Sequence, residues 1–277
     1  MNTNAFPDRI IQTIADLSAE AKQKAKSLQA EANEVARVQK MWNDLHSFLH
    51  KGWSLHILDL MGRETILLKK LRAENHPAMP TLDEVYRAAK DQANTILRRF
   101  PAHLEEACNA NKLPIDRESR HPRYSFERGF LKLEVDDRKG VARLTDHEGR
   151  LDEFPADIGA IVKVVQREHT RIFGRLFDGD KFLKKLRRQY LAVIKKLGKS
   201  DGTSVPIRHI TRRLGKNEKG FRTDEFLVDL SRLVEQGPIE IDGRRLDLQQ
   251  TKDTNQGMLL IGAAGRGYIG FIIFKEV

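Results

Sequence analysis

The chain has 277 residues, 40% of them hydrophobic and 32% charged, so it can bury a substantial core and divide into more than one part. The net charge is +10, and the single Cys108 excludes an intramolecular disulfide or an all-cysteine zinc site and fits a reducing cytoplasm. Residues 1–8 lack the features of a signal peptide, and no apolar run approaches the roughly 20 residues of a membrane span. We therefore expect a cytoplasmic protein.

A long helix is predicted from Pro7-Asp8 onward, because apolar or small residues recur every seven positions. This row comprises Ile14, Ala21, Leu28, Val35, Trp42 and Leu49. A second row contains Ile10, Leu17, Val38 and Leu45 and is interrupted by Lys24 and Glu31. The pattern is typical of a coiled coil, and we expect the first row to bind a protein partner; packing within the chain itself is the equal alternative. Gly52 and Gly62 are expected to break or bend the helix.

The next segment, after a connector at residues 75–80, is predicted to be helical. Thr81 and Glu84 match a capping box, which places the helix start at Thr81 and its end near Arg99, before Pro101. A short helix is expected to follow at residues 103–111.

From Arg120 the apolar period changes from helical to alternating, which predicts strands. Three short alternating runs are separated by turn-rich segments, at residues 130–135, 141–144 and 151–154. We expect a small antiparallel meander of three or four strands. Two helices are predicted after it, at 158–173 and at 181–197, and the second carries most of its lysines and arginines on the side opposite its apolar face.

The last part of the chain has the order of a winged helix. Short helices are predicted at 205–214, with Pro206 in the first turn, and at 223–235, followed by a hairpin around Asp242-Gly243. Strands at 258–261 and 268–274, joined by a loop at 262–267, would complete a small sheet. The fold class is thus α+β and mostly helical. Its parts are a long helical, coiled-coil-like segment at 1–75, a helical segment at 76–118, a meander with basic helices at 119–200 and a winged-helix-like unit at 201–277.

Positive charge is concentrated between Lys163 and Arg222. That stretch holds 18 Lys or Arg against 5 acids, a balance of 18 − 5 = +13, whereas the whole chain carries 49 − 39 = +10. Such a density attracts a polyanion, and duplex DNA held through its phosphates is the expected ligand. The candidate contact residues are Lys181, Lys184, Lys185, Arg187, Arg188, Lys195, Lys196, Arg208, Arg212, Arg213, Lys216, Lys219 and Arg222, with Arg244 and Arg245 of the hairpin.

Enzymatic alternatives have weaker support in the sequence. Gly198-Lys199-Ser200 is not a phosphate-binding loop, because Val193 occupies the position of the required glycine. No histidine pattern indicates a metal site, and no cofactor is expected. A metal-dependent nuclease would have to use Glu134, Asp136 and Asp137, near Asp116. A scaffold that binds an acidic protein through the same cations is the third alternative.

Three stretches and the overall layout resemble known accessory proteins. The layout is the heptad-patterned N-terminal helix with the winged-helix-like unit at 204–277, and the stretches are Ser119–Tyr124, Phe221–Phe226 and Asp253–Gly257. In these respects the chain looks like kleisin-type accessory subunits of SMC-like ATPases, and like accessory proteins of Lamassu-type bacterial anti-phage and anti-plasmid defence. The resemblance implies a non-catalytic subunit that binds an ATPase and DNA.

Overall fold

A computed structural model describes residues 6–253, 256–262 and 265–277, and its fold is α+β as predicted. The chain divides into two compact units, one up to Thr95 and one from Ile96 onward. The boundary between these two units lies inside the segment predicted at 76–118, so it does not coincide with any of the predicted segment boundaries. Along the described ranges, no helix has the length and apolar character to cross a membrane.

The first unit is built from helices. It contains α1 (Asp8–Lys51), α2 (Ser54–Arg63), α3 (Thr65–Ala73) and the first part of α4 (Met79–Arg98). Gly52 ends α1 in the left-handed conformation, with φ of 66°, and its N–H donates to the carbonyl of Leu49. The predicted breaks at Gly52 and near Gly62 are therefore confirmed.

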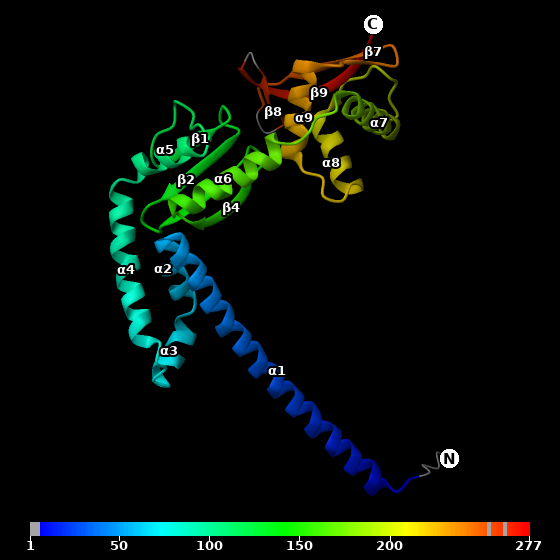
Figure 1. Ribbon diagram of the computed structural model, residues 1–277. Helices are drawn as coiled ribbons and strands as arrows, with labels where there is room; N and C mark the ends of the chain where they lie inside the picture. Colours follow the sequence, from blue (N-terminus) through cyan, green and yellow to red (C-terminus); the bar gives the residue numbers. More distant parts are fainter. Residues whose placement is uncertain (1–5, 254–255, 263–264) are drawn as a thin grey trace. The chain divides into compact units, whose positions relative to one another are not determined.

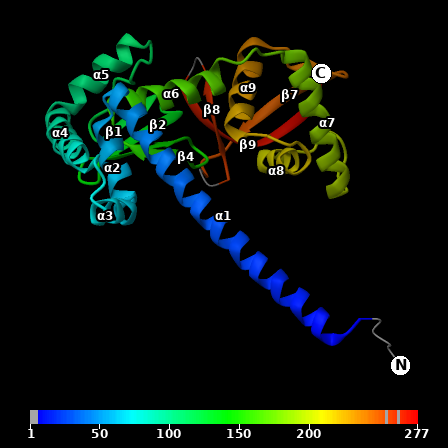
Figure 2. The ribbon, with the colours of Figure 1, turned by 60° about the horizontal axis from the view of Figure 1, so that its bottom comes forward.

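Only the C-terminal part of α1 belongs to the core of this unit. Met41 and Leu45 pack with apolar residues of the other helices, which include Ile57, Leu60, Leu67, Leu71, Met79, Leu82 and Ala89. From Asp8 to Arg37, by contrast, every residue of α1 is exposed. Figures 1 and 2 show this part of α1 extending beyond α2 and α3. The predicted heptad rows are thus buried only near their C-terminal end.

The predicted capping box at Thr81 is wrong. Helix α4 begins at Met79, so Thr81 lies in its first turn instead of preceding it. The backbone N–H of Met79 donates to the carbonyl of His76, which extends the helix backward past the threonine. Pro80 in the first turn permits this start, because the missing N–H has no helical partner there in any case.

The first half of the second unit is a meander covered by helices. Strands β1 (Arg123–Phe126), β2 (Leu131–Asp136), β3 (Val141–Thr145) and β4 (Arg150–Pro155) pair antiparallel in chain order. Alternate residues of β2 are buried, and helices α5 (Phe100–Ala110) and α6 (Ile158–Phe173) supply further buried apolar side chains of this half. The four-stranded meander and helix 158–173 are confirmed.

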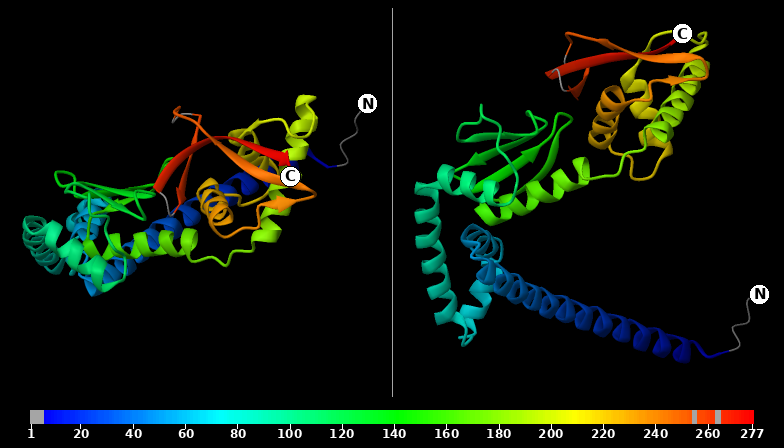
Figure 3. Two further views of the ribbon diagram at one scale, coloured as in Figure 1. Left: turned by 90° about the horizontal axis from the view of Figure 1, so that it is seen from above. Right: turned by 45° about the horizontal axis from the view of Figure 1, so that its top comes forward.

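The second half has the winged-helix order of elements. Its helices are α7 (Gly179–Leu197), α8 (Ile207–Asn217) and α9 (Thr223–Gln236). Its strands are β5 (Val205–Pro206), β6 (Glu240–Ile241), β7 (Arg244–Gln250), β8 (Met258–Gly262) and β9 (Gly265–Glu276). The sheet order is β5-β9-β7-β6, with β8 also paired to β9, and the helices lie on one face of this sheet (Figure 3).

Two boundaries in this half differ from the prediction. Val205 and Pro206 form a strand against β9, so the helix starts at Ile207 and not at Val205. Strand β9 begins at Gly265, which shortens the predicted 262–267 loop; residues 263 and 264 of that loop lie outside the described residues. The same holds for residues 1–5 of the opening stretch and for residues 254 and 255 of the Asp253–Gly257 stretch.

Gly179 fixes where α7 starts relative to the end of α9. A Cβ atom at Gly179 would lie 2.6 Å from the carbonyl oxygen of Gly237 and 2.9 Å from Pro238. A side chain therefore cannot be added there without moving backbone. The N-terminal turn of α7 is further held by Asp178, whose side chain accepts a hydrogen bond from the N–H of Lys181 at 2.9 Å.

Candidate nucleic-acid interface

The cations of the stretch 163–222 fall into two groups, according to whether a carboxylate lies beside them. Seven of the 18 have a carboxylate within 4.0 Å among the described residues, and they are Arg167, Arg171, Arg175, Lys185, Arg187, Arg208 and Arg222. In the part of the chain that the structure describes, the other eleven have no such partner: Lys163, Lys181, Lys184, Arg188, Lys195, Lys196, Lys199, Arg212, Arg213, Lys216 and Lys219. The second group is the one available to an external anion.

Helix α7 presents a row of unpaired cations on its outer side. Lys181, Lys184, Arg188 and Lys195 follow one another at helical spacing, and all four are exposed. The opposite side of α7 is anchored by Leu183, Leu186, Tyr190, Val193 and Ile194, all buried. Burial of that apolar face fixes the direction in which the cations point.

Helix α8 adds a second set of cations beside the C-terminal end of α7. Lys196 of α7 lines one groove with Arg212, Arg213 and Lys216 of α8, and the groove has a volume of about 320 Å³. Val193, Leu197, His209 and Asn217 complete the lining, which contains no acid among the described residues. Arg213 donates to the Oε1 of Gln189 at 3.0 Å, which holds its guanidinium at the edge of the groove.

We define the α7–α8 face as Lys181, Lys184, Arg188, Lys195, Lys196, Arg212, Arg213 and Lys216. The structure thus brings eight of the candidates predicted from sequence onto two packed helices. Lys219 is also exposed and lies in the turn before α9, near Lys185 and Arg222. Sequence reasoning did not include His209, although its position three and four residues before Arg212 and Arg213 on α8 was a usable signal.

Arg187 was predicted to contact phosphate and is instead buried. Its guanidinium forms a bidentate pair with Asp201, with Nη1 and Nη2 at 2.7 and 2.5 Å from the two carboxylate oxygens. Its guanidinium also lies 4.9 Å from the centre of the Phe274 ring. The hydrogen bond from Arg187 lowers the pKa of Asp201. Arg187 therefore links α7 to the strand β9 and does not face solvent.

The remaining hairpin and turn candidates are mostly engaged within the chain. Arg244 bridges Asp201, at 3.1 Å, and Glu276, at 2.7 Å. Lys185 pairs with Glu218 at 2.5 Å, and Arg208 pairs with Glu148 at 3.1 Å. Arg245 of β7 is exposed and has no ion pair to a described carboxylate. Of these candidates only Arg245 resembles the α7–α8 face in its environment.

Helix α9 occupies the position of the base-reading helix in a helix-turn-helix, yet it is acidic. It carries Asp224, Glu225 and Asp229, and these receive Arg171 and Arg175 from α6 and its following turn. Its own Arg232 donates to the backbone carbonyls of Phe173 and Arg175. A helix that reads base edges would have to enter the major groove with free donors. These three acids are therefore engaged within the chain.

The Arg171 guanidinium is the centre of that acidic contact. It pairs with Asp224, with Glu225 at 2.7 Å and with Glu168 at 2.8 Å. Burial alone would raise the pKa of Asp224, but hydrogen bonds from Arg171 and Arg222 outweigh it and lower that pKa. The same carboxylates raise the pKa of Arg171 despite its partial burial. These ion pairs join α6 to α9.

The acids proposed for a nuclease are not gathered into a metal site. Asp137 pairs with His121 at 2.6 Å, and Asp136 accepts the backbone N–H of Lys139 at 3.1 Å within a turn. Glu134 lies 3.6 Å from Arg123 on the neighbouring strand. Among the described residues, no three His, Cys, Asp or Glu side chains are placed to hold a metal ion together. Asp116 instead accepts the backbone N–H groups of Arg128 and Gly129.

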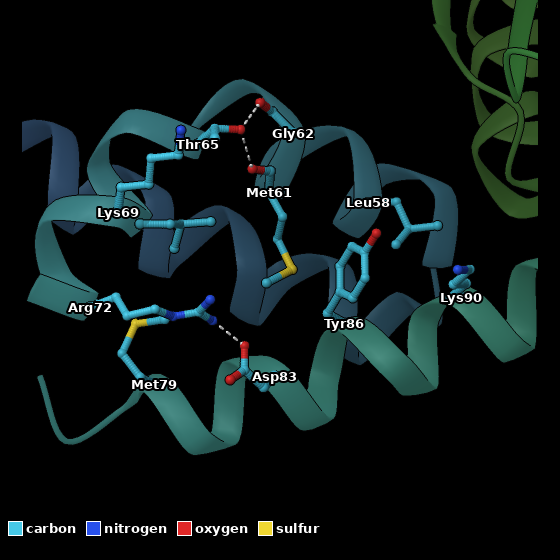
Figure 4. Close-up of a pocket in the computed structure, with 11 residues that line it drawn as sticks. Leu58, Met61, Gly62, Thr65, Lys69, Arg72, Met79, Asp83, Tyr86 and Lys90 are labelled. Atoms are coloured by element: carbon cyan, nitrogen blue, oxygen red, sulfur yellow. Dashed lines mark hydrogen bonds and ion pairs between the residues drawn. The ribbon is translucent and has the colours of Figure 1, made fainter. Parts of the chain in front are cut away.

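A second hollow lies in the first unit between α2–α3 and α4 (Figure 4). It has a volume of about 590 Å³. Tyr86 and Met61 lie on facing helices there, and Arg72 pairs with Asp83 at the rim. The hydroxyl of Thr65 donates to the carbonyl of Gly62 at 2.6 Å, so it is engaged with α2. The groove is lined by both apolar and charged side chains.

The predicted partner row on α1 is exposed over most of its length. Ile14 is 61% exposed, Leu28 56% and Val35 67%, and Ala21 is exposed as well. Trp42 is half-buried, because it packs against the core of the first unit, and Leu49 is 47% exposed.

The comparison of this chain with family models, with curated proteins and with solved structures finds no match in any of the three.

Proposed function

We propose that the chain is a cytoplasmic, non-catalytic DNA-binding subunit that holds duplex DNA by its phosphates on the α7–α8 face and docks to a protein partner through α1. The observation that carries the proposal is the lack of described carboxylates within 4.0 Å of any of the eight cations on that face. A solvated cationic surface without compensating acids is attracted to a polyanion, and each phosphate contact releases a counterion.

The charges on the two helices of the helix-turn-helix favour contact with the DNA phosphates over recognition of the bases. In that motif the first helix crosses the phosphate backbone, while the second enters the major groove. Here the first helix, α8, carries Arg212, Arg213 and Lys216, whereas the second, α9, has acids paired within the chain. We therefore expect little preference for base sequence. The resemblance noted above makes a complex with an SMC-like ATPase in anti-phage or anti-plasmid defence the expected setting.

The test is a salt titration of binding to short fluorescent duplexes, with two charge-matched triple variants. Lys184→Glu, Arg188→Glu and Lys195→Glu together should weaken binding at least about 100-fold, because three expected phosphate contacts become repulsive. Lys112→Glu, Lys132→Glu and Arg138→Glu change the net charge equally on exposed positions of the same unit, and this control should lower affinity only slightly. Equal losses in the two variants would show that net charge alone matters and would defeat the proposal.

The same titration separates DNA from an acidic protein surface. A logarithm of the affinity that falls steeply with the logarithm of the salt concentration, and that is insensitive to base sequence, is the behaviour expected for phosphate contacts. Absence of measurable binding at low salt, together with capture of an acidic polypeptide by the same face, would favour the scaffold interpretation instead.

A further inference from the structure

The exposed part of α1 carries two rows of apolar side chains, here called seams, that lie outside the core of its own unit. Ile14, Leu17 and Leu28 lie there with more than half of their surface exposed. From Asp8 to Arg37 the helix has 30 residues, which correspond to roughly 45 Å of length. A helix of this kind draws its stability from a packed apolar face, since propensity alone leaves an isolated helix marginal in water.

The two seams have the spacing of heptad positions a and d. Ile14, with its seven-residue repeats, occupies a, and Leu17 occupies d. The d seam contains one cation and one anion, Lys24 and Glu31, both exposed and neither with a described ion partner. These two charges discriminate between the ways in which a second helix can lie along the seam.

A parallel, in-register pair of α1 helices is disfavoured by those charges. It would set Lys24 against Lys24 of the second copy and Glu31 against Glu31, two like-charge layers inside the seam. Polar residues at such positions specify register and orientation in coiled coils. Like charges at close approach are repulsive, and the repulsion grows as the seam excludes water.

An antiparallel pair centred near Lys26 removes both conflicts. Lys24 of one helix then lies about three residues, roughly 4.5 Å along the axis, from Glu31 of the other. The same register sets Leu17 opposite Val35 and Ile14 opposite Val38, a residue that is half-buried against the core of its own unit. The small Ala21 faces Glu31, which leaves room for the carboxylate to turn toward the lysine. Leu17 is thus matched with Val35, while Lys24, which lies opposite Leu28, comes within reach of Glu31 of the other helix.

We propose that α1 forms an antiparallel two-stranded coiled coil with α1 of a second copy of this chain, with Lys24 of each helix paired to Glu31 of the other. This names the protein partner of α1 in the function proposed above and rests on that docking role, but not on DNA binding. A monomeric chain that binds duplex DNA would contradict this inference alone. A dimer that does not bind DNA would contradict only the DNA-binding proposal.

The first test is the mass of the full chain in solution, measured by light scattering over a concentration series. We expect twice the 31.8 kDa of the chain. Leu17→Ala with Leu28→Ala should raise the dimer Kd at least about 100-fold, since four apolar side chains per dimer are truncated. Alanine keeps the helix intact, because it has the highest helix propensity.

The matched control is Gln23→Ala with Gln29→Ala, on the outer side of the same helix, which should leave the dimer Kd unchanged. A wild-type chain that stays monomeric up to its solubility limit overturns the proposal. Equal weakening by the seam variant and the outer variant overturns it as well.

The second test is a charge swap that reports orientation. Lys24→Glu alone and Glu31→Lys alone should each raise the dimer Kd by about tenfold, because both symmetric ion pairs become repulsive. The double variant restores opposite charges across the antiparallel pair and should return to the wild-type Kd. In a parallel pair all of these variants, like the wild type, place like charges opposite each other at positions 24 and 31. The double variant would then not bind its copy more tightly than the single variants.

Single engineered cysteines give an independent readout of orientation. Ala25→Cys lies beside its own copy only in the antiparallel pair, whereas Ile14→Cys meets its own copy only in the parallel pair. The native Cys108 does not interfere, since it is fully buried and burial raises its thiol pKa to about 11. Disulfide formation by Ala25→Cys but not by Ile14→Cys is the expected result, and the reverse would contradict the proposal.

Discussion

Two neighbouring groups of cations in one basic stretch have opposite environments. Arg171 and Arg175, in and just after α6, are paired with acids of α9, and Asp224 there is only 2% exposed. Lys184, Arg188 and Lys195 on α7 have no described acid beside them and face solvent. The first group holds the second unit together, whereas the second is free for an external anion. Positive charge summed along a sequence does not distinguish these two roles.

The reason is the distance in sequence between a cation and its partner. Arg171 and Asp224 are 53 residues apart, and Arg175 and Asp229 are 54 apart, so no spacing rule within a helix reveals them. Apart from Glu168 of α6 itself, the carboxylates that pair with Arg171 and Arg175 belong to α9, which lies outside the basic stretch. Only the fold decides which cations remain uncompensated.

Among the tests of this comparison, removal of the Arg171 side chain is expected to have the largest effect on stability. Arg171→Ala should reduce the free energy of unfolding by about 3 kcal/mol, since it leaves the buried Asp224 without its main partner. Urea denaturation measures this loss. DNA affinity below the unfolding transition should not change. A folded variant with reduced DNA affinity would show that the two groups of cations act together.

Arg187 and Arg188 offer the comparison at adjacent positions. Arg187→Ala should cost about 2 kcal/mol of stability, because it breaks the bidentate pair with Asp201, and should leave DNA affinity unaltered. Arg188→Ala should change stability by less than about 0.5 kcal/mol and lower the salt slope by about 0.9. Chemical denaturation and salt titration of both variants check this, and interchanged outcomes would break the comparison.

Acid should weaken the paired group. The folded-state pKa of Asp224 lies below its usual 3.8, so ionised Asp224 stabilises the fold above that usual value. This contribution is lost as the pH falls below 3.8 and through the lower folded-state pKa. Asp224→Asn removes this source of acid sensitivity, so its stability should decline less between about pH 5 and pH 2. An identical acid profile for the two proteins, measured by denaturation, would contradict the assignment.

The smallest effect is expected at the meander acids. Asp136→Ala should reduce the free energy of unfolding by about 0.5 kcal/mol, through loss of the turn contact to Lys139, and should leave DNA affinity unchanged. The measurement includes plasmid nicking with Mg²⁺. Nicking by the wild-type chain that disappears in this variant would establish the nuclease alternative.

The sequence predicted the helices and strands better than it predicted which charged side chains are buried or paired. Periodicity located α6 and the four-stranded meander, and Asp242-Gly243 located the hairpin, because these signals are local. The start of α4 was placed at Thr81 because that residue matches a capping box, but the helix begins at Met79, so that Pro80 and Thr81 both lie in its first turn. At the interface, α7 was recognised from its amphipathic pattern. Burial of Arg187 was not foreseen, because Asp201 lies beyond the helix and reaches it only through a turn.

The contact of Gly179 with the carbonyl of Gly237 has a consequence for recognition. The backbone of the first turn of α7 lies close to the backbone that follows α9 there, so a shift of this end of α7 would disturb the end of α9. The lysines and arginines along its outer side therefore start from a fixed helical frame, and only their flexible tips have to be ordered when an anion arrives. Association then carries a smaller entropic penalty than it would from a loosely tethered basic tail of the same charge.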